Sequence, residues 1–169
     1  YLPQSEQHIS ENNLKESIMA NTYTRLYIHV VIRIKRGYPT IKKDFEEKLY
    51  AYMGAVIRNQ GHIPVRINGV SDHVHILFIQ KPIEGLSALM REIKSESCRM
   101  INEKGWVRGR FRWQIGYGAF SCDHHSVDKI VGYIEQQKEH HSRGCSFREE
   151  YEKFLEDYEV DWDEKYIED

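Results

Sequence analysis

The sequence HVHILFI, residues 73–79, has the residue alternation of a β-strand. Alternate side chains on a strand point to opposite faces, so we expect one apolar set to enter the core: Val74, Ile76 and Phe78. Residues 63–68 form a short strand just before it, and Asn68-Gly69 is a turn signal. The two segments are therefore predicted to pair as a β-hairpin with a slightly long loop.

Helix and strand patterns extend from this hairpin on both sides. Apolar residues alternate along 26–34, as in a strand with one buried face, and 106–122 contains one or two short strands with tight bends. Helical spacing of apolar residues predicts four helices: about 42–59, 86–102, 126–142 and from 146 onward. Ser146 and Glu149 are spaced as a capping box for the last helix. This order predicts an α+β fold near a ferredoxin-like or RRM-like plan, a mainly antiparallel sheet with helices packed on it.

The length and composition suit one ordinary globular domain. The chain has 169 residues, of which 40% are hydrophobic and 30% charged. Residues 1–18 are polar and weakly patterned, so we expect a disordered or non-native leader there and a single domain over 19–169. No apolar run approaches the roughly 18 to 20 residues that span a bilayer, and no secretory signal is visible. Three widely spaced cysteines argue against a disulfide framework or a Cys zinc site and fit a reducing cytoplasm.

The charges are unevenly distributed along the chain. The formal net charge is -2, yet residues 19–148 hold 21 Lys and Arg against 12 Asp and Glu, whereas 149–169 hold 2 against 11. A basic body attracts polyanions such as nucleic acid, but charges scattered over solvated faces explain these counts equally well. We expect the acidic tail to dock as an amphipathic helix from about 146. A sharper hypothesis is that the tail competes with DNA for the basic surface.

Two histidines share one face of the strand at 73–79. His73 and His75 are two residues apart, so their imidazoles point the same way, near enough to bind one metal ion. Asp72 lies beside them and is placed to orient one ring. A bare His-x-His pair is more often found on a solvated sheet face, because histidine is common on surfaces. The pair alone therefore does not establish a metal site.

A tyrosine and a glutamine share one face of the predicted helix at 126–142. Tyr133 and Gln137 are four residues apart, so they lie one turn apart on the same side, and His141 continues the ridge. A helical tyrosine usually packs in the core, but a polar stripe headed by a tyrosine is less typical of a core face. His140 and His141 rank as surface residues rather than metal ligands.

Phosphoryl transfer gives a chemical reason for these residues to act together. A tyrosine phenol, with a pKa of roughly 10, is a poor nucleophile. It attacks a phosphodiester when a divalent cation polarises the phosphate and the groups are held in line. Two imidazoles and an amide oxygen leave coordination positions open for phosphate oxygens. The resulting phosphotyrosine link conserves bond energy, so the strand can be rejoined without ATP.

Three ordered segments resemble one known family: DHVHILF at 72–78, WQIGYGAF at 113–120 and YIEQQKEHH at 133–141. Together they resemble the small single-tyrosine HUH transposases (TnpA type) of the simplest insertion sequences. The closing segments FREEY at 147–151 and DEKY at 163–166 also resemble that family's tail. The resemblance covers roughly residues 19–169. It depends on the whole set with its Tyr133–Gln137 spacing, since the His-x-His pair is weak by itself.

The resemblance implies a site and a reaction. His73 and His75 would be metal ligands with Gln137 as the third, and Tyr133 would be the nucleophile that becomes linked to a 5′ phosphate. The metal would be Mg²⁺ or Mn²⁺, although imidazole ligands alone favour Mn, Zn, Ni or Cu over Mg. The segment CDHH at 122–125 departs from the pattern and leaves the exact metal environment open.

The resemblance also implies partners. The substrate would be single-stranded DNA carrying imperfect hairpins near the element ends. The protein would be a homodimer in which the tyrosine helix of one subunit can complete the site of the other, and assembly in cis or in trans is left open. Two other hypotheses remain: a domesticated nuclease with the same chemistry, and a non-catalytic single-stranded nucleic-acid-binding protein of the same fold.

Two basic segments are candidate DNA contacts. Arginines can clamp phosphates, and aromatic rings can stack on unpaired bases at about 1 to 3 kcal/mol per base. The candidates are Arg33, Lys35, Arg36, Arg108, Arg110, Arg112 and Trp113. The alternative is that the charges are solvated strand ends and that Trp113 belongs to the core.

Overall fold

Four antiparallel strands form one sheet in the computed structural model, which describes residues 22–168. The strands are β1 (Leu26–Arg33), β2 (Ile63–Gly69), β3 (His73–Gln80) and β4 (Gly118–Cys122), in the spatial order β2-β3-β1-β4. The predicted hairpin of β2 and β3 is confirmed. With one helix after β1 and another after β3, this is the ferredoxin-like arrangement that the sequence predicts. The expected leader at 1–18 lies outside the described residues.

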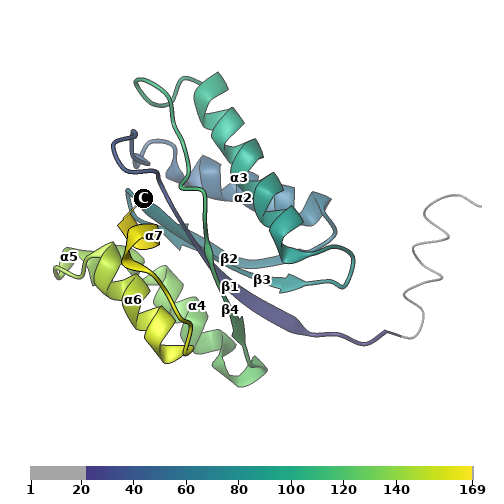
Figure 1. Ribbon diagram of the computed structural model, residues 1–169. Coiled ribbons are helices and arrows are strands. Elements are labelled where there is room, and N and C mark those ends of the chain that lie inside the picture. The colour runs from purple at the N-terminus through teal and green to yellow at the C-terminus, as the bar shows by residue number, and fades with distance from the viewer. Residues whose placement is uncertain (1–21, 169) are drawn as a thin grey trace, which may run out of the picture.

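Helices cover both faces of this sheet (Figure 1). On one face lie α2 (Glu46–Asn59) and α3 (Leu86–Glu103). On the other lie α4 (Val127–Glu135), α5 (Gln137–Ser142), α6 (Phe147–Asp157) and α7 (Glu164–Glu168), and the short η1 (His124–Ser126) precedes α4. Among the residues that the structure describes, no helix is both long enough and apolar enough to cross a membrane.

Strand β1 is buried on both faces, which corrects the expectation of one buried face. Val30 and Ile32 enter the main core beneath α2 and α3, whereas Val31 packs against residues of β4, α6 and α7. The apolar residues of β3 enter the main core as predicted: Val74, Ile76 and Phe78. The C-terminal helices therefore convert the second sheet face, where the two histidines point, into an interior.

The helix predicted over 126–142 is interrupted, and Gln136 lies between α4 and α5 with φ -88° and ψ 8°. The Asn68 amide in β2 donates to the carbonyls of Ile134, at 2.9 Å, and Glu135, at 3.2 Å. A continuous helix would use these carbonyls for its own backbone hydrogen bonds. Ser126 precedes α4 but its side chain makes no capping hydrogen bond, whereas Asp123 accepts the backbone N–H of His125 at the start of η1.

The last predicted helix begins as expected. Ser146 caps α6 by accepting the Glu149 N–H, and the Glu149 carboxylate accepts the Ser146 N–H in return. This reciprocal capping box fixes the first turn of α6. Its position matters because α6 brings its inner face onto β1 and β3.

Segment 106–122 contains one strand, β4, and a single bridge between Ile34 and Trp113. The loop at 114–116 is held by Lys94 of α3, whose ammonium donates to the carbonyls of Gln114, Ile115 and Gly116. Burial lowers the pKa of Lys94 to about 8. The predicted tight bends are thus stabilised from the helix layer rather than by strand pairing.

Replacing Gly69 by alanine is expected to destabilise the protein and disturb the start of β3. The added Cβ would lie 2.2 Å from the His73 carbonyl oxygen and 2.9 Å from the Val74 Cα, and backbone cannot yield as a side-chain tip can. We expect a loss of about 2 to 3 kcal/mol in the free energy of unfolding, measured by urea denaturation. Gly132→Ala in α4 is the control, because nothing lies within 4 Å of its Cβ position. An equal loss in both variants would contradict this account.

Candidate active site

The two histidines of β3 lie side by side beneath the C-terminal helices. His73 and His75 are both 0% exposed, and their ring centroids are 5.1 Å apart. The alternative of two surface histidines is therefore wrong. The Phe147 ring of α6 lies 4.9 Å from the His73 ring and helps to close the site.

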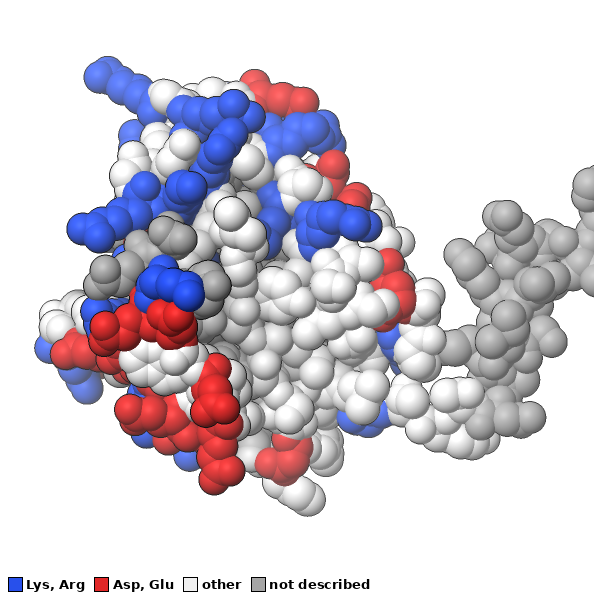
Figure 2. Space-filling model, in the orientation of Figure 1, with Lys and Arg blue, Asp and Glu red and all other residues white. Residues whose placement is uncertain are grey.

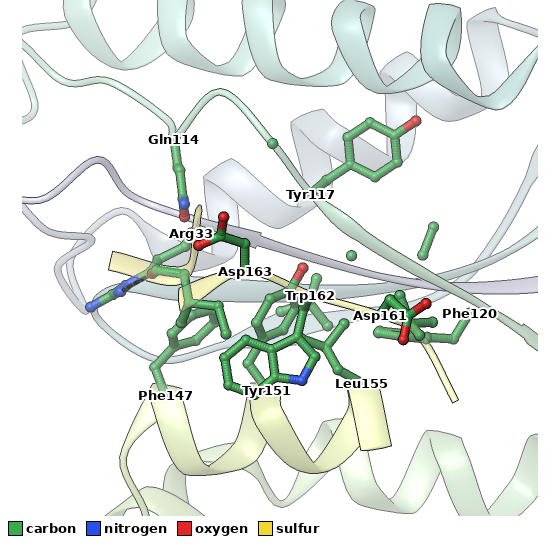
Figure 3. A pocket seen from close by; sticks show the side chains of 16 residues that line it. Arg33, Gln114, Tyr117, Phe120, Phe147, Tyr151, Leu155, Asp161, Trp162 and Asp163 are labelled. Carbon is green, nitrogen blue, oxygen red and sulfur yellow. Dashed lines mark hydrogen bonds between the residues drawn. The ribbon is translucent and has the colours of Figure 1, made fainter. Parts of the chain in front are cut away.

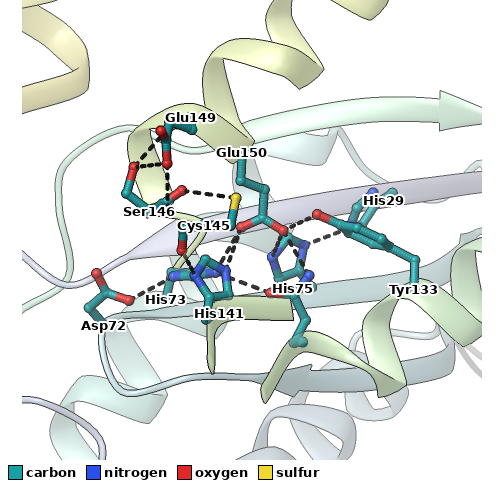
Figure 4. Close-up of polar contacts among 11 residues, drawn as sticks. His29, Asp72, His73, His75, Tyr133, His141, Cys145, Ser146, Glu149 and Glu150 are labelled. Carbon is teal, nitrogen blue, oxygen red and sulfur yellow. Dashed lines mark hydrogen bonds and ion pairs between the residues drawn. The ribbon is translucent and has the colours of Figure 1, made fainter. Parts of the chain in front are cut away.

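A carboxylate from α6 lies between these imidazoles (Figure 4). Glu150 is 5% exposed. Its Oε2 is 3.1 Å from His73 Nε2, and its Oε1 is 3.4 Å from His75 Nε2. A charge this deeply buried is costly unless it is paired, so these contacts stabilise the docking of α6 on the sheet.

Tyr133 and Gln137 reach the same carboxylate from the other side. The Tyr133 hydroxyl donates to Glu150 Oε1, and Gln137 Nε2 donates to the same oxygen at 2.7 Å. Gln137 Oε1 lies 3.4 Å from His73 Nε2. The structure thus brings together all four residues that the sequence nominated as nucleophile and ligands, although the helix between Tyr133 and Gln137 is interrupted.

His141 also joins the cluster, although the sequence ranked it as a surface residue. Its Nε2 is 3.0 Å from Glu150 Oε2, and its Nδ1 is 2.6 Å from the Cys145 carbonyl oxygen. His73, His141 and Glu150 each offer one ligand atom, and these atoms lie within 4.8 Å of one another. An ion bound among these three groups would have two nitrogen ligands and one oxygen ligand.

Each histidine of β3 has its second ring nitrogen held by another residue. Asp72 Oδ1 is 2.7 Å from His73 Nδ1, as the sequence predicts. His29 Nε2 of β1 is 2.9 Å from His75 Nδ1, a partner that the sequence does not reveal. Such contacts fix ring orientation, which directs both Nε2 atoms toward Glu150.

The cluster shifts the proton affinities of its members strongly. Burial opposes the charge of His73, but hydrogen bonds and charges from Asp72 and Glu150 raise its pKa to about 9. Burial keeps the pKa of His75 below its ordinary value. Burial opposes the charge of Glu150, but its contacts with His73 and His75 hold its pKa far below the usual range.

Tyr133 has the opposite perturbation. Burial, and then its hydrogen bond to the Glu150 carboxylate, raises the pKa of its phenol well above the ordinary value. The hydroxyl is therefore protonated and engaged as a donor at neutral pH. It must leave this bond before it can act as a nucleophile.

The predicted DNA-contact residues lie in different parts of the fold. Arg108, Arg110 and Arg112 are exposed in the loop after α3, and the Lys35 N–H donates to the Arg112 carbonyl at 2.9 Å, so the two basic segments are neighbours. In Figure 2, Lys and Arg gather over the α2–α3 end and acidic residues over the C-terminal helices. Arg33 instead lies near the histidines, with its guanidinium 4.5 Å from the centre of the Phe147 ring.

Trp113 is a core residue, which corrects its nomination as a stacking platform. It is 7% exposed, and its indole N–H donates to Ser97 Oγ at 2.9 Å. Apolar neighbours and a buried hydrogen-bond partner together account for this position. The alternative that the sequence left open, a buried Trp113, is the one observed.

Glu150 is the central residue that sequence reasoning missed. One signal was available: Glu150 lies three residues after Phe147 and four before Phe154, within the apolar stripe of its helix. An acid on the inner face of an amphipathic helix needs a buried partner. The adjacent acids Glu149 and Glu152 hide this signal, because they make the helix look uniformly acidic.

Glu150→Gln is expected to destabilise the metal-free protein by about 3 kcal/mol, since it leaves buried cationic histidine without its counter-charge. The free energy of unfolding would be measured by urea denaturation with a chelator present. Glu156→Gln is the matched control, because Glu156 is exposed on the same helix. A loss no larger than in the control would show that the carboxylate does not stabilise α6 docking.

The stability of the metal-free protein is expected to fall between pH 6.5 and about 9. His73 has its pKa raised from 6.5 to about 9, so its contribution is fully present below pH 6.5 and is lost as pH rises through 9. Denaturation at pH 6.5, 7.5 and 9 would measure this slope. His73→Asn should flatten it, whereas His125→Asn, at an exposed position, should leave it unchanged. A parallel fall in both variants would assign the slope to other groups.

Comparison with known proteins places this geometry in context. A family model described as IS200-like transposase matches residues 22–137, which include both histidines of β3 as well as Tyr133 and Gln137. Among curated proteins no match is found.

Two solved structures share the fold. A candidate transposase from Deinococcus radiodurans aligns with a TM-score of 0.56 and 20% identity, over 69% of this chain and 94% of that one. A REP-associated tyrosine transposase bound to a REP hairpin aligns with a TM-score of 0.54 and 14% identity, over 72% of each chain. Since the family match spans more than half of the sequence, the protein belongs to the IS200-like transposase family.

Proposed function

We propose that this transposase nicks and rejoins single-stranded DNA through a covalent 5′-phosphotyrosine at Tyr133. The observation that carries the proposal is the convergence of the Tyr133 hydroxyl, the Gln137 amide and the two β3 histidines on one buried carboxylate. A tyrosine beside a ligand-rich cluster is the arrangement that phosphoryl transfer to a protein nucleophile requires.

The reaction balances within this cluster. The Tyr133 oxygen forms a bond to phosphorus, the bond from phosphorus to the 3′ oxygen breaks, and the leaving strand takes up a proton as a free 3′ hydroxyl. The phenolic proton passes to solvent or to a nearby carboxylate. Attack of a 3′ hydroxyl on the phosphotyrosine reverses these steps and rejoins DNA without an external energy source.

The residues present fit a divalent cation. His75 Nε2 is buried and makes no hydrogen bond, although Glu150 Oε1 is 3.4 Å away. We propose His73, His75 and Gln137 as ligands, with Glu150 adding a carboxylate oxygen and His141 within reach. Amide and carboxylate oxygens beside imidazoles favour Mn²⁺ and ease the binding of Mg²⁺. When bound, the cation supplies polarisation of the phosphate and neutralisation of its charge.

The proposed partner is DNA with a hairpin beside the cleavage site. One fold relative is described as bound to a REP hairpin, and the exposed arginines after α3 give this chain a basic end that suits a phosphate backbone. We also propose a homodimer, in which the tyrosine helix can serve either subunit's site. The three cysteines of the chain are free, as a reducing cytoplasm would keep them.

An alternative is a non-catalytic or domesticated single-strand-binding protein of the same fold. The hydrogen bond that ties up the Tyr133 hydroxyl is the observation that favours it. Cleavage decides between these functions, because binding is common to both.

Tyr133→Phe is expected to abolish a covalent protein–DNA adduct. The substrate is a hairpin oligonucleotide, labelled at its 5′ or its 3′ end, whose single-stranded flanks are taken from the DNA that borders the gene. It is incubated with protein and Mn²⁺, and the products are separated on a denaturing gel. Only the label on the 3′ side of the nick should travel with the protein. Tyr52→Phe on the far helix layer is the control and should retain the adduct. An adduct of undiminished yield in Tyr133→Phe would refute the assignment.

Metal removal is expected to abolish the same adduct, and Mn²⁺ should restore it at least as well as Mg²⁺. Binding can be followed independently by the loss of the free Mn²⁺ signal in electron paramagnetic resonance. We expect His73→Ala to lower the affinity for Mn²⁺ at least tenfold, because His73 contacts both Gln137 and Glu150. His125→Ala, outside the cluster, should bind like the parent protein. Equal Mn²⁺ affinity in both variants would exclude His73 as a ligand.

A further inference from the structure

Arg33 lies where three hollows of the surface meet. At the end of β1 it lines a groove of about 760 Å³, a small hollow of about 130 Å³ and a third hollow of about 410 Å³. In the sheet register Arg33 pairs with His73 of β3. A continuous track past Arg33 would therefore reach the candidate active site.

The groove is the first part of this track, and aromatic side chains line it (Figure 3). Tyr151 and Phe120 form its inner wall, and Trp162, which is 39% exposed, stands at its mouth. Gly118 makes room here, because a Cβ at that position would lie 2.6 Å from Tyr151 Cε2. The volume lies within the range of about 300 to 1,000 Å³ that is usual for small-ligand pockets and exceeds the need of one nucleotide.

The small hollow carries cationic side chains. It is lined by Arg33, Arg36 and Arg148 together with Ile167. Arg148 is also paired with Glu152 and Glu164 on the helix surface. Three guanidinium groups around one hollow match a phosphate, since each presents planar N–H donors to its oxygens.

The third hollow leads to the cluster of His73, His141 and Glu150. Its lining includes Asp72 and His141, both of which contact the buried cluster. Phe147 borders this hollow and the groove, and its ring packs against both Arg33 and His73. The aromatic wall and the arginines thus adjoin the histidine cluster, with the Phe147 ring between Arg33 and His73.

We propose that these three hollows form one binding track for the strand that is cut. An unpaired base sits in the groove against Tyr151 and Trp162, its phosphate lies at the three arginines, and the next phosphate enters the site beside His141. The inference rests on the proposed single-strand chemistry and adds where the strand runs. Of the predicted DNA contacts it uses Arg33 and Arg36, and it adds Arg148, Tyr151 and Trp162.

The order of chemistries favours a nucleic-acid strand over a protein partner. Single strands are bound by alternating aromatic platforms and cationic groups, because every base has a stacking face and every linkage a charge. Two carboxylates, Asp161 and Asp163, also line the groove. They would repel a phosphate there but accept the N–H groups of a base edge, which places the base in the groove and the phosphate at the arginines.

The test is binding by the Tyr133→Phe protein, which would hold a strand without cutting it, to a fluorescent mixed-sequence 20-mer in chelator. We expect Trp162→Ala to weaken binding by about 5-fold to 100-fold, as the loss of one stacking contact does. Arg36→Ala should lower the slope of log affinity against log salt by about 0.7. Tyr23→Ala and Arg99→Ala, which change an exposed tyrosine and an exposed arginine elsewhere, are the matched controls.

A second measurement locates the strand directly. In 5-fluorotryptophan protein, the ¹⁹F resonance of Trp162 should shift on adding the 20-mer, whereas those of Trp106 and Trp113, which pack at the main core, should not. Unchanged affinity for the 20-mer in both Trp162→Ala and Arg36→Ala would refute the proposed track. A Trp162 resonance that does not shift at saturating 20-mer would refute it as well. Absence of any strand binding overturns it as well. Adduct formation by the unmodified protein is scored separately, so failed cleavage with the expected binding pattern would refute the nicking chemistry alone.

Discussion

The pairing of one buried carboxylate with two buried histidines is the constraint on which the site depends. Glu150 comes from α6, while His73 and His75 come from β3. Neither Glu150 nor His73 could stay charged in an interior without the other, because removing a charge from water costs several kcal/mol unless it is compensated. The same interaction therefore docks the C-terminal helices and assembles the candidate active site. The acidic C-terminal segment is therefore part of the same folded unit as the sheet and the helix that carries Tyr133.

This pairing also determines the state of the Tyr133 hydroxyl, the proposed nucleophile. With Tyr133 donating to Glu150, the phenol keeps its proton and its pKa is high. A phosphate that approached the same point would meet a carboxylate of like charge, so a cation or protonated His73 would have to offset the repulsion. His73, with its pKa raised to about 9, carries such a charge at neutral pH. In the proposed function an incoming phosphate would therefore compete with Glu150 for the same donors.

Local sequence patterns predict most of the sheet, but they do not predict the part of the candidate site that the C-terminal helices supply. The hairpin, the inward apolar residues of β3 and the capping box at Ser146 depend on neighbours in the chain, so spacing predicts them. The interruption at Gln136 depends on Asn68, an amide some seventy residues away that takes helix carbonyls. Glu150 and His141 become site residues only because α6 folds over β3. Helical spacing puts Glu150 in an apolar stripe and His141 on the Tyr133–Gln137 ridge, but it does not show which residues they contact.

The distribution of charge explains why the acidic tail and a DNA-binding function coexist. The acids of α6 and α7 lie mostly on outer faces, paired along their own helices, as Lys153 is with Asp157. Among the acids of these helices whose side chains the structure describes, only Glu150 is buried, next to the two histidines of β3. Arg33 stands at the border between this acidic layer and the sheet, stacked on Phe147 and donating to the Ile167 carbonyl. A strand that reaches Tyr133 past Arg33 would therefore approach along a cationic edge, and the acids on either side would confine it to that edge.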